Sequence, residues 1–260
     1  MRITVLMENT AARPDMIAEH GLSLYVETEK HRILFDAGQS EAFAENAQKL
    51  GVKLQDADLA VLSHGHYDHG GGMLRFLQEN DHAPLYVHRA AFQPHWHGLD
   101  RYIGLPPALK DNDRVIPVAD EHIIDDELTL CTCNAMPMAW PPSFGGLQVM
   151  RGGQLAPDDF LHEQYLVVKE GDKRVVISGC SHKGAMNVLT WLRPEVFIGG
   201  FHFVKMDPQG EQLQASIKAM AAFPCRYLTG HCTGQEQYDA LKDMLGERIG
   251  YLSTGMTFEV

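Results

Sequence analysis

The chain has 260 residues, of which 45% are hydrophobic and 22% are charged, and its formal net charge is −12. Such a composition is typical of a soluble globular protein with one large α/β domain or two small ones. The negative charge argues against a nucleic-acid or anionic-membrane partner, because phosphate binding requires a basic face. It leaves a small-molecule substrate open, since a metal site can supply positive charge locally.

The cysteine content and the N-terminal residues indicate a cytoplasmic protein. The five cysteines include no CxxC pair, which argues against a disulfide framework or a structural zinc knuckle. The N-terminal residues predict a β-strand, and Glu8 stands where a signal peptide would continue its apolar core. No apolar run is long enough to span a membrane.

Apolar runs predict strands along the chain, and helical patterns lie between some of them. Strands are expected at residues 3–7, 22–27, 32–35, 59–62, 84–87, 128–133, 165–169, 175–178, 196–198 and 226–229. Helices are expected at residues 41–50, 72–79, 185–192, 212–222 and 235–245. This mixture suggests two packed sheets covered by helices, in a layered α/β arrangement. Because no repeat or linker interrupts the pattern, we expect a single domain over residues 1–260.

The most informative stretch is His64-Gly-His66-Tyr-Asp68-His69, which follows an apolar strand. Alternate side chains of an extended segment point the same way, so His64 and His66 can converge on one metal ion. The three glycines that follow allow a sharp turn, which would aim Asp68 and His69 toward a second ion. Two neighbouring cations can share a water, lower its pKa and clamp the attacking and leaving atoms of a reaction.

Further candidates stand in loops that directly follow other strands, where the binding groups of α/β sheets converge. We expect His182 and His231 to bind metal, whereas His202 has either a substrate contact or a structural role. Cys180 could ligate or border the metals as a thiolate, although a buried free cysteine is more often an apolar filler. Asp36 is expected to hydrogen-bond a ligand histidine or to cap a helix.

The motif HxHxDH after a strand resembles the signature of the metallo-β-lactamase superfamily, whose fold is a four-layer αββα sandwich with a two-metal site along one edge. Further blocks resemble, in their order, the 7,8-dihydropterin-6-methyl-4-(β-D-ribofuranosyl)aminobenzene-5′-phosphate synthase-like branch of that superfamily. These blocks are residues 35–40, 62–71, 178–184, 199–202 and 229–234. The resemblance therefore extends from near the N-terminus almost to the C-terminus.

The resemblance implies a ligand set for the metals. His64 and His66 would hold one ion, while Asp68, His69 and His231 would hold the second. One or two divalent ions are expected, with zinc as the first expectation and iron or manganese as alternatives.

Two positions depart from the usual superfamily pattern. Many members have a bridging aspartate where this chain has Cys180, so one tight and one labile ion also fit the sequence. The superfamily's middle histidine is expected before Tyr165; His162 is a weak candidate for it, and His182 is better placed in this branch.

Two reactions fit such a site. In the reaction of the named branch, an aryl ribofuranoside phosphate displaces diphosphate from the methylene of a dihydropterin, and metal ions neutralise the leaving group. In the commoner superfamily reaction, a metal-bound hydroxide attacks an ester, lactone, thioester or phosphodiester. Asp68 and His202 are the expected catalytic residues in either case. A di-iron redox role is disfavoured because the chain has no room for the usual flavin-binding domain, and a pure binding protein would have no use for so dense a ligand cluster.

The segment of about 92–144 is irregular and rich in proline, and we expect this loop-rich insertion to cover the site. Aromatic side chains offer surfaces on which a pterin or aryl ring could stack: Trp96, Tyr102, Trp140 and Phe144. Basic side chains offer donors to a phosphate: His95, His97, Arg101, Lys110, Arg151 and Lys183. The alternative is that the aromatics form a small satellite core and the charges are solvated.

Overall fold

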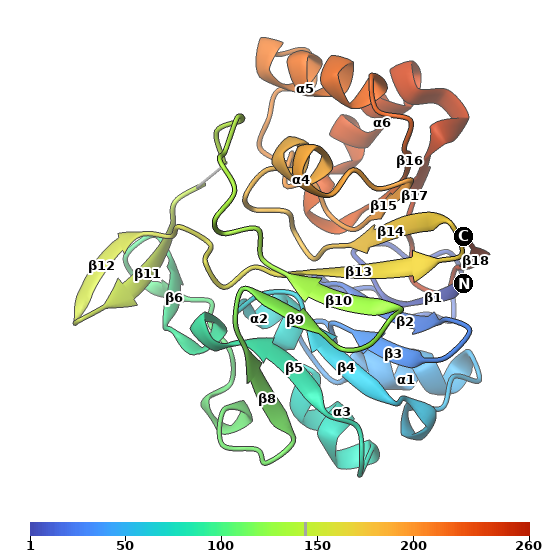
Figure 1. The fold of residues 1–260 in the computed structure, drawn as a ribbon, viewed down its shortest axis with the longest axis vertical. Coiled ribbons are helices and arrows are strands. Elements are labelled where there is room, and N and C mark those ends of the chain that lie inside the picture. The colour runs from blue at the N-terminus through green and yellow to red at the C-terminus, as the bar shows by residue number, and fades with distance from the viewer. Residues whose placement is uncertain (143–144) are drawn as a thin grey trace. The chain divides into compact units, whose positions relative to one another are not determined.

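The structure is a computed structural model that describes residues 1–142 and 145–260 (Figure 1). The chain divides into two compact units. Unit 1 comprises Met1–Ala119, Gly146–Gln164 and Ser253–Val260, and unit 2 comprises Asp120–Gly145 and Tyr165–Leu252. Each unit has its own seven-stranded sheet and its own apolar core.

The large sheet of unit 1 has the strand order β18-β1-β2-β3-β4-β5-β8. The strands β18, β1, β2 and β3 pair antiparallel, whereas β3, β4, β5 and β8 pair parallel. Since β3 and β4 are parallel neighbours, the loops that follow them start side by side at one edge of the sheet. The bounds are β1 Arg2–Met7, β2 Ser23–Glu27, β3 Arg32–Phe35, β4 Leu59–Leu62, β5 Leu85–His88, β8 Val115–Val118 and β18 Thr257–Glu259.

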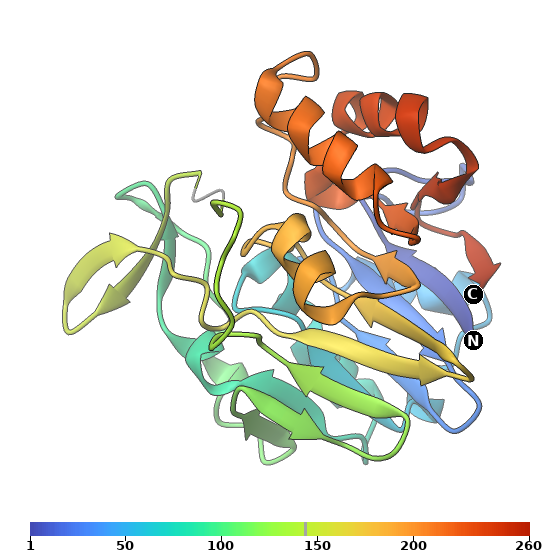
Figure 2. The same ribbon diagram turned by 45° about the horizontal axis from the view of Figure 1, so that its top comes forward.

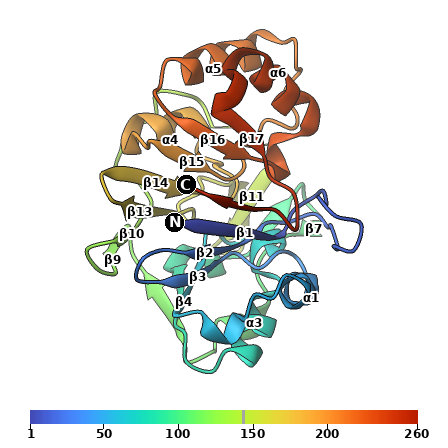
Figure 3. The same ribbon diagram turned by 90° about the vertical axis from the view of Figure 1, so that its right-hand side faces the viewer.

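Helices α1 (Ala42–Lys49) and α3 (Met73–Glu79) lie on one face of this sheet (Figure 3). Phe43 of α1 and Phe76 of α3 are fully buried in the same apolar cluster as Leu34 of β3. Burying side chains of this size contributes roughly 1.5–3 kcal/mol each. The short helix α2 and the 3₁₀ turns η1, η2 and η3 complete the connections: α2 Tyr67–Gly70, η1 Leu54–Asp56, η2 Arg89–Phe92 and η3 Pro107–Leu109.

A second, smaller sheet also belongs to unit 1. Its strand order is β12-β11-β6-β7, and all of its neighbours pair antiparallel. The β11–β12 hairpin is the yellow-green ribbon at the left of Figure 2. The bounds are β6 His95–His97, β7 Arg101–Tyr102, β11 Leu147–Arg151 and β12 Gln154–Pro157.

The sheet of unit 2 has the order β17-β16-β15-β14-β13-β10-β9. Strands β14 to β17 pair parallel and the others antiparallel. Helices α4, α5 and α6 pack on one face through a buried apolar cluster that includes Leu189, Ile217 and Leu241 (Figure 3). The bounds are β9 Glu121–Ile123, β10 Leu128–Cys131, β13 Tyr165–Glu170, β14 Lys173–Ile177, α4 Ala185–Leu192, β15 Val196–Ile198, α5 Glu211–Ala221, β16 Arg226–Thr229, η4 His231–Thr233, α6 Gln235–Leu245, η5 Gly246–Arg248 and β17 Ile249–Tyr251.

The predicted helices and strands occur within one or two residues of their expected bounds. For example, α4 and α6 have the predicted bounds, and β2 begins at Ser23 rather than at residue 22. The segment of about 92–144 is less irregular than expected, because its described part contains β6 to β10. Strand β10 was expected at residues 128–133, but β6 to β9 were missed, because two to four residues carry too little alternation to predict a strand. Whether the segment covers the site, and whether residues 1–260 act as one domain, stay predictions.

None of the helices in the described ranges is both long and apolar enough to cross a membrane.

Candidate metal centre

The predicted metal-binding loop lies in unit 1, directly after β4. His64 follows the strand, His66 is the residue before α2, and Asp68 and His69 lie within α2. The short helix, rather than a glycine turn alone, re-aims the last two side chains. The His64 ring centroid lies 4.6 Å from that of His66 and 4.1 Å from that of His69. All four side chains are buried or nearly so, and the structure brings them together as the motif predicts.

Asp36 lies in the neighbouring loop, after β3, and connects two of these histidines. Its Oδ1 accepts the backbone N–H of Ser63 at 2.7 Å, and its Oδ2 accepts the Ser63 hydroxyl at 2.7 Å. The same Oδ2 lies 2.6 Å from Nδ1 of His69. Because the Ser63 hydroxyl donates to Asp36, its oxygen is left to accept from Nδ1 of His64, which lies 2.8 Å away.

This network fixes the tautomers of His64 and His69. Both rings carry hydrogen on Nδ1, so both Nε2 atoms keep a lone pair that can bind a cation. A carboxylate behind a histidine is the usual support of a metal ligand. Asp36 itself is fully buried and has a φ of 56°, a region that is costly for residues other than glycine. The donor set of unit 1 therefore fits a divalent metal.

The surroundings shift the pKa values of two of these histidines in opposite directions. Burial, together with the nearby His162 and His95, lowers the pKa of His66 well below its ordinary value. His66 is thus held as the neutral imidazole that metals bind. Burial alone would lower the pKa of His69, but the carboxylates of Asp36 and Asp68 raise it.

Asp68 has a partner that the sequence did not indicate. Its Oδ2 lies 3.2 Å from Nε2 of His20, a half-exposed residue, and 3.8 Å from Nε2 of His69. Asp68 is thus held between two imidazoles of unit 1, and its carboxylate lies beside the nitrogen of His69 that can bind a cation.

The remaining predicted ligands lie in unit 2, in loops that follow β14, β15 and β16. Cys180, His231 and Cys232 offer one ligand atom each within 4.8 Å of one another. The ring centroids of His182 and His202 are 4.5 Å apart. His202 and His231 have φ values of 55° and 50°, and such strained residues concentrate at functional sites. That these residues share metals with His64, His66, Asp68 and His69 stays a proposal.

The predicted substrate contacts fall in different places. Trp140 and His202 line the same cavity of unit 2, which has a volume of about 180 Å³. Trp96 and Tyr102 form an edge-to-face pair in the small sheet of unit 1, with ring centroids 5.4 Å apart. Phe144 lies outside the described residues.

The expectation of a phosphate contact for Lys183 is corrected by the structure. Lys183 is fully buried, and its Nζ donates to the carbonyl oxygen of Thr132 at 2.8 Å. A strand-end position predicts an exposed cation only if the loop turns outward, and this loop turns inward. Arg151 is also occupied, by a two-point ion pair with Asp159.

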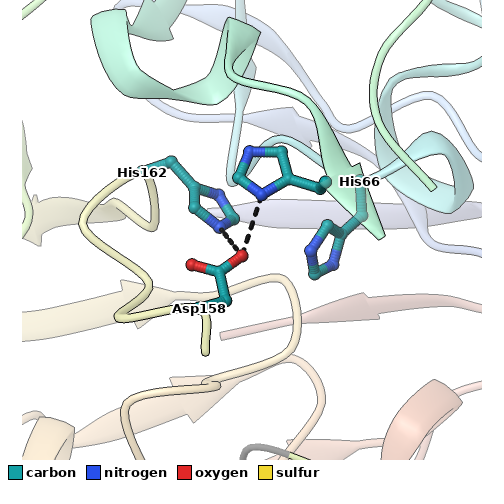
Figure 4. Close-up of side chains that lie close together, drawn as sticks. His66, Asp158 and His162 are labelled. Atoms are coloured by element: carbon teal, nitrogen blue, oxygen red, sulfur yellow. Dashed lines mark hydrogen bonds and ion pairs between the residues drawn. The ribbon is translucent and has the colours of Figure 1, made fainter. Parts of the chain in front are cut away.

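A grouping that the sequence did not indicate lies beside His66, although His162 was named as a weak candidate for the middle ligand histidine. His95, Asp158 and His162 are all buried, and with His66 they offer four ligand atoms within 4.8 Å of one another (Figure 4). The only sequence signal was the i, i+4 spacing of Asp158 and His162, which reads as an ordinary polar turn. His95 was expected to contact phosphate, but its Nδ1 lies 2.8 Å from Asp158 Oδ2 instead.

The fold is mixed α/β, and buried histidines follow a strand that pairs parallel with its neighbours. A family model for the metallo-beta-lactamase superfamily matches residues 17–231. The chain therefore belongs to the metallo-beta-lactamase superfamily, and the fold class predicted from the resemblance is confirmed.

Individual relatives agree with this assignment. The crystal structure of Tm1679, a metal-dependent hydrolase of the beta-lactamase superfamily, is 30% identical, with a TM-score of 0.85, over 100% of this chain and 99% of that one. An uncharacterized protein of Methanocaldococcus jannaschii is 29% identical over 242 residues, which cover 89% of this chain and 90% of the relative. The 7,8-dihydropterin-6-methyl-4-(beta-D-ribofuranosyl)-aminobenzene-5'-phosphate synthase of the same organism is 27% identical over 276 residues, or 92% of this chain and 89% of the relative.

Proposed function

We propose that the protein is a metal-dependent enzyme that joins an aryl compound to a dihydropterin with loss of diphosphate. The ligands would be His64, His66, Asp68 and His69 of unit 1 together with His182 and His231 of unit 2, with Cys180 at or beside the metals. The observation that carries the metal dependence is the network of Asp36, which leaves Nε2 of His64 and His69 ready to bind a cation. One or two ions are expected, with zinc first and iron or manganese as alternatives.

A divalent ion held by these residues would supply Lewis acidity and positive charge to the departing diphosphate. The chain's own residues would keep the ligand histidines in the form that binds a metal. Asp36 keeps two ligand histidines in the binding tautomer, and the low pKa of His66 keeps that imidazole neutral at physiological pH. Because the net charge is −12, a bound metal ion is the expected local source of positive charge for a phosphate-bearing substrate.

The cavity of unit 2 supports an aryl substrate. Its apolar lining includes Trp140, Met186, Phe201 and Phe203, and His202 stands among them. Its volume is about 180 Å³, and an apolar cavity of about 150 Å³ is enough to take benzene. One planar ring therefore fits, such as the aminobenzene ring in the name of the 27% identical synthase. His202 would then be the acid–base group beside that ring.

A hydrolase of an ester, lactone, thioester or phosphodiester is the second candidate. The observation that favours it is the likeness to Tm1679, a metal-dependent hydrolase, over the whole chain. The two candidates share their metal ligands and differ in whether water is a substrate.

The deciding experiment measures pyrophosphate release by metal-loaded protein. The protein receives 6-hydroxymethyl-7,8-dihydropterin diphosphate with and without the aryl ribofuranoside phosphate, and His69→Ala serves as the inactive variant. Release that requires both substrates and His69 would support the synthase. No release would refute it and would direct the work to ester, lactone, thioester and phosphodiester panels.

The ligand set has a separate test in metal content. His66→Ala, His182→Ala and His231→Ala should each bind less zinc per chain than the native protein after dialysis. His82→Ala is the control, because His82 is exposed and pairs with Asp81 at 3.2 Å. Native zinc content in His182→Ala and His231→Ala would limit the ligands to unit 1.

A further inference from the structure

His162 was a weak candidate for the middle ligand histidine of the superfamily, and its hydrogen bonds are those of a residue that supports the loop. Its Nδ1 accepts the backbone N–H of Gly65, the residue between His64 and His66, at 2.9 Å. An N–H can only donate, so Nδ1 must be the bare nitrogen and the ring hydrogen must lie on Nε2. That nitrogen lies 3.2 Å from Oδ2 of Asp158 and donates to it. Both nitrogens of His162 are thus occupied within unit 1, and Figure 4 shows the contact with Asp158.

Asp158 is in turn fixed by several donors. Its Oδ2 also accepts Nδ1–H of His95 at 2.8 Å, and its Oδ1 accepts the backbone N–H of Phe160 at 2.8 Å. Burial would raise the pKa of Asp158, but the hydrogen bonds from His162 and His95 hold it below its ordinary value. The carboxylate is fully buried and ionised, so it orients both imidazoles strongly.

The backbone of Gly65 is also packed closely against its neighbours. A Cβ added at Gly65 would collide with the carbonyl oxygen of Ala91 and would lie 2.9 Å from Nε2 of His95. The loop backbone at Gly65 is therefore held both by close packing against His95 and Ala91 and by the hydrogen bond to His162. Nε2 of His95 is buried and has no hydrogen-bond partner among residues 1–142 and 145–260.

We propose that His162 is a positioning residue of the metal-binding loop and not a metal ligand. It fixes the amide between His64 and His66, while Asp158 and His95 fix His162. The metal half of this inference rests on the proposed function, but the support of the loop does not. In this proposal, His95, Asp158 and His162 support the loop that carries His66 and do not themselves bind an ion.

The test uses Co²⁺ as the probe metal and three variants. His162→Asn keeps an acceptor near the Nδ1 position for the Gly65 amide but lacks the bond to Asp158. His162→Gln reaches the Nε2 position but loses the acceptor, and His162→Ala loses both. For a positioning residue, His162→Ala and His162→Gln should weaken Co²⁺ binding about 10–100-fold, as is usual when the support of a ligand is removed. His162→Asn should stay within about threefold of the native affinity, since the bond that holds the loop is retained.

The absorption spectrum of bound Co²⁺ separates the two roles. Its bands depend on the ligand atoms, so at saturation all three variants should show the native bands and stoichiometry. Changed bands or a lost ion in His162→Asn would overturn the proposal and make His162 a ligand.

A measurement on metal-free protein keeps the result independent of metal binding. His162→Ala should speed hydrogen exchange of the Gly65 amide at least tenfold, and His162→Asn should restore most of the protection. Equal hydrogen exchange of the Gly65 amide in native protein and His162→Ala would refute the proposal that His162 supports the loop. If native protein bound no Co²⁺, the proposed function would fail, while the exchange experiment would still decide whether His162 supports the loop.

Discussion

Replacement of Asp36 by asparagine should release two candidate ligands from their fixed tautomers. The native carboxylate accepts from the Ser63 amide, the Ser63 hydroxyl and His69 Nδ1 at 2.7, 2.7 and 2.6 Å. In Asp36→Asn, one oxygen can still accept the amide, but an NH₂ group then faces the hydroxyl and the imidazole. His69 would have to carry its hydrogen on Nε2, which is the nitrogen that a metal needs.

The expected loss follows from these contacts. Removing the support of a ligand weakens metal binding by about 10–100-fold, which corresponds to about 1.4–2.8 kcal/mol. The metal-free protein should also lose stability, because hydrogen bonds to a charged group contribute about 1.5–3 kcal/mol each and asparagine replaces only part of them. A net loss of about 2 kcal/mol would lower the Tm of a chain of this size by about 4–8 °C.

Chelator competition with Zn²⁺ gives the affinity, and thermal unfolding of metal-free protein gives the Tm. Asp58→Asn is the matched control, because Asp58 also accepts a backbone N–H, from Arg32 at 2.7 Å, but at an exposed position. The control should keep native metal affinity. A Zn²⁺ affinity of Asp36→Asn within twofold of native would refute the tautomer argument.

Three further predictions follow from other contacts. Gly65→Ala should lower the unfolding free energy by about 1–3 kcal/mol, measured by urea, because its Cβ would collide with a neighbouring carbonyl oxygen. The pKa of Asp158 lies below its ordinary value of 3.8. Urea unfolding at a series of pH values should therefore show the full difference in unfolding free energy between native protein and Asp158→Asn above about pH 4, and a smaller difference at lower pH. Asn187→Ala should raise KM for an aryl substrate about tenfold with little change in kcat, since Asn187 bonds the backbone of Trp140 at 2.8 and 3.0 Å; Asn46→Ala, which removes a buried asparagine of unit 1, should leave KM unchanged.

Several features of the site could be predicted from local sequence. The side chains of the histidine motif after β4 lie together as predicted, because period-two alternation and a strand end set their directions. Asp36 was predicted to support a ligand histidine from its place after a strand, and it lies 2.6 Å from His69. Cys180, His182, His202 and His231 were found by the same strand-end rule, although their part in metal binding stays a proposal.

The sequence by itself thus determined the fold class, the superfamily and the loop that carries the metal-binding motif, because each rests on a pattern within about ten residues. Only the tertiary structure decided what supports that loop. The bond from Gly65 to His162 joins residues 97 apart, and that from His95 to Asp158 joins residues 63 apart. Likewise, only the folded chain shows that Lys183 turns inward to Thr132, across 51 residues. Hydrogen-bond partners so distant along the chain depend on how strands order within a sheet, which no local pattern encodes.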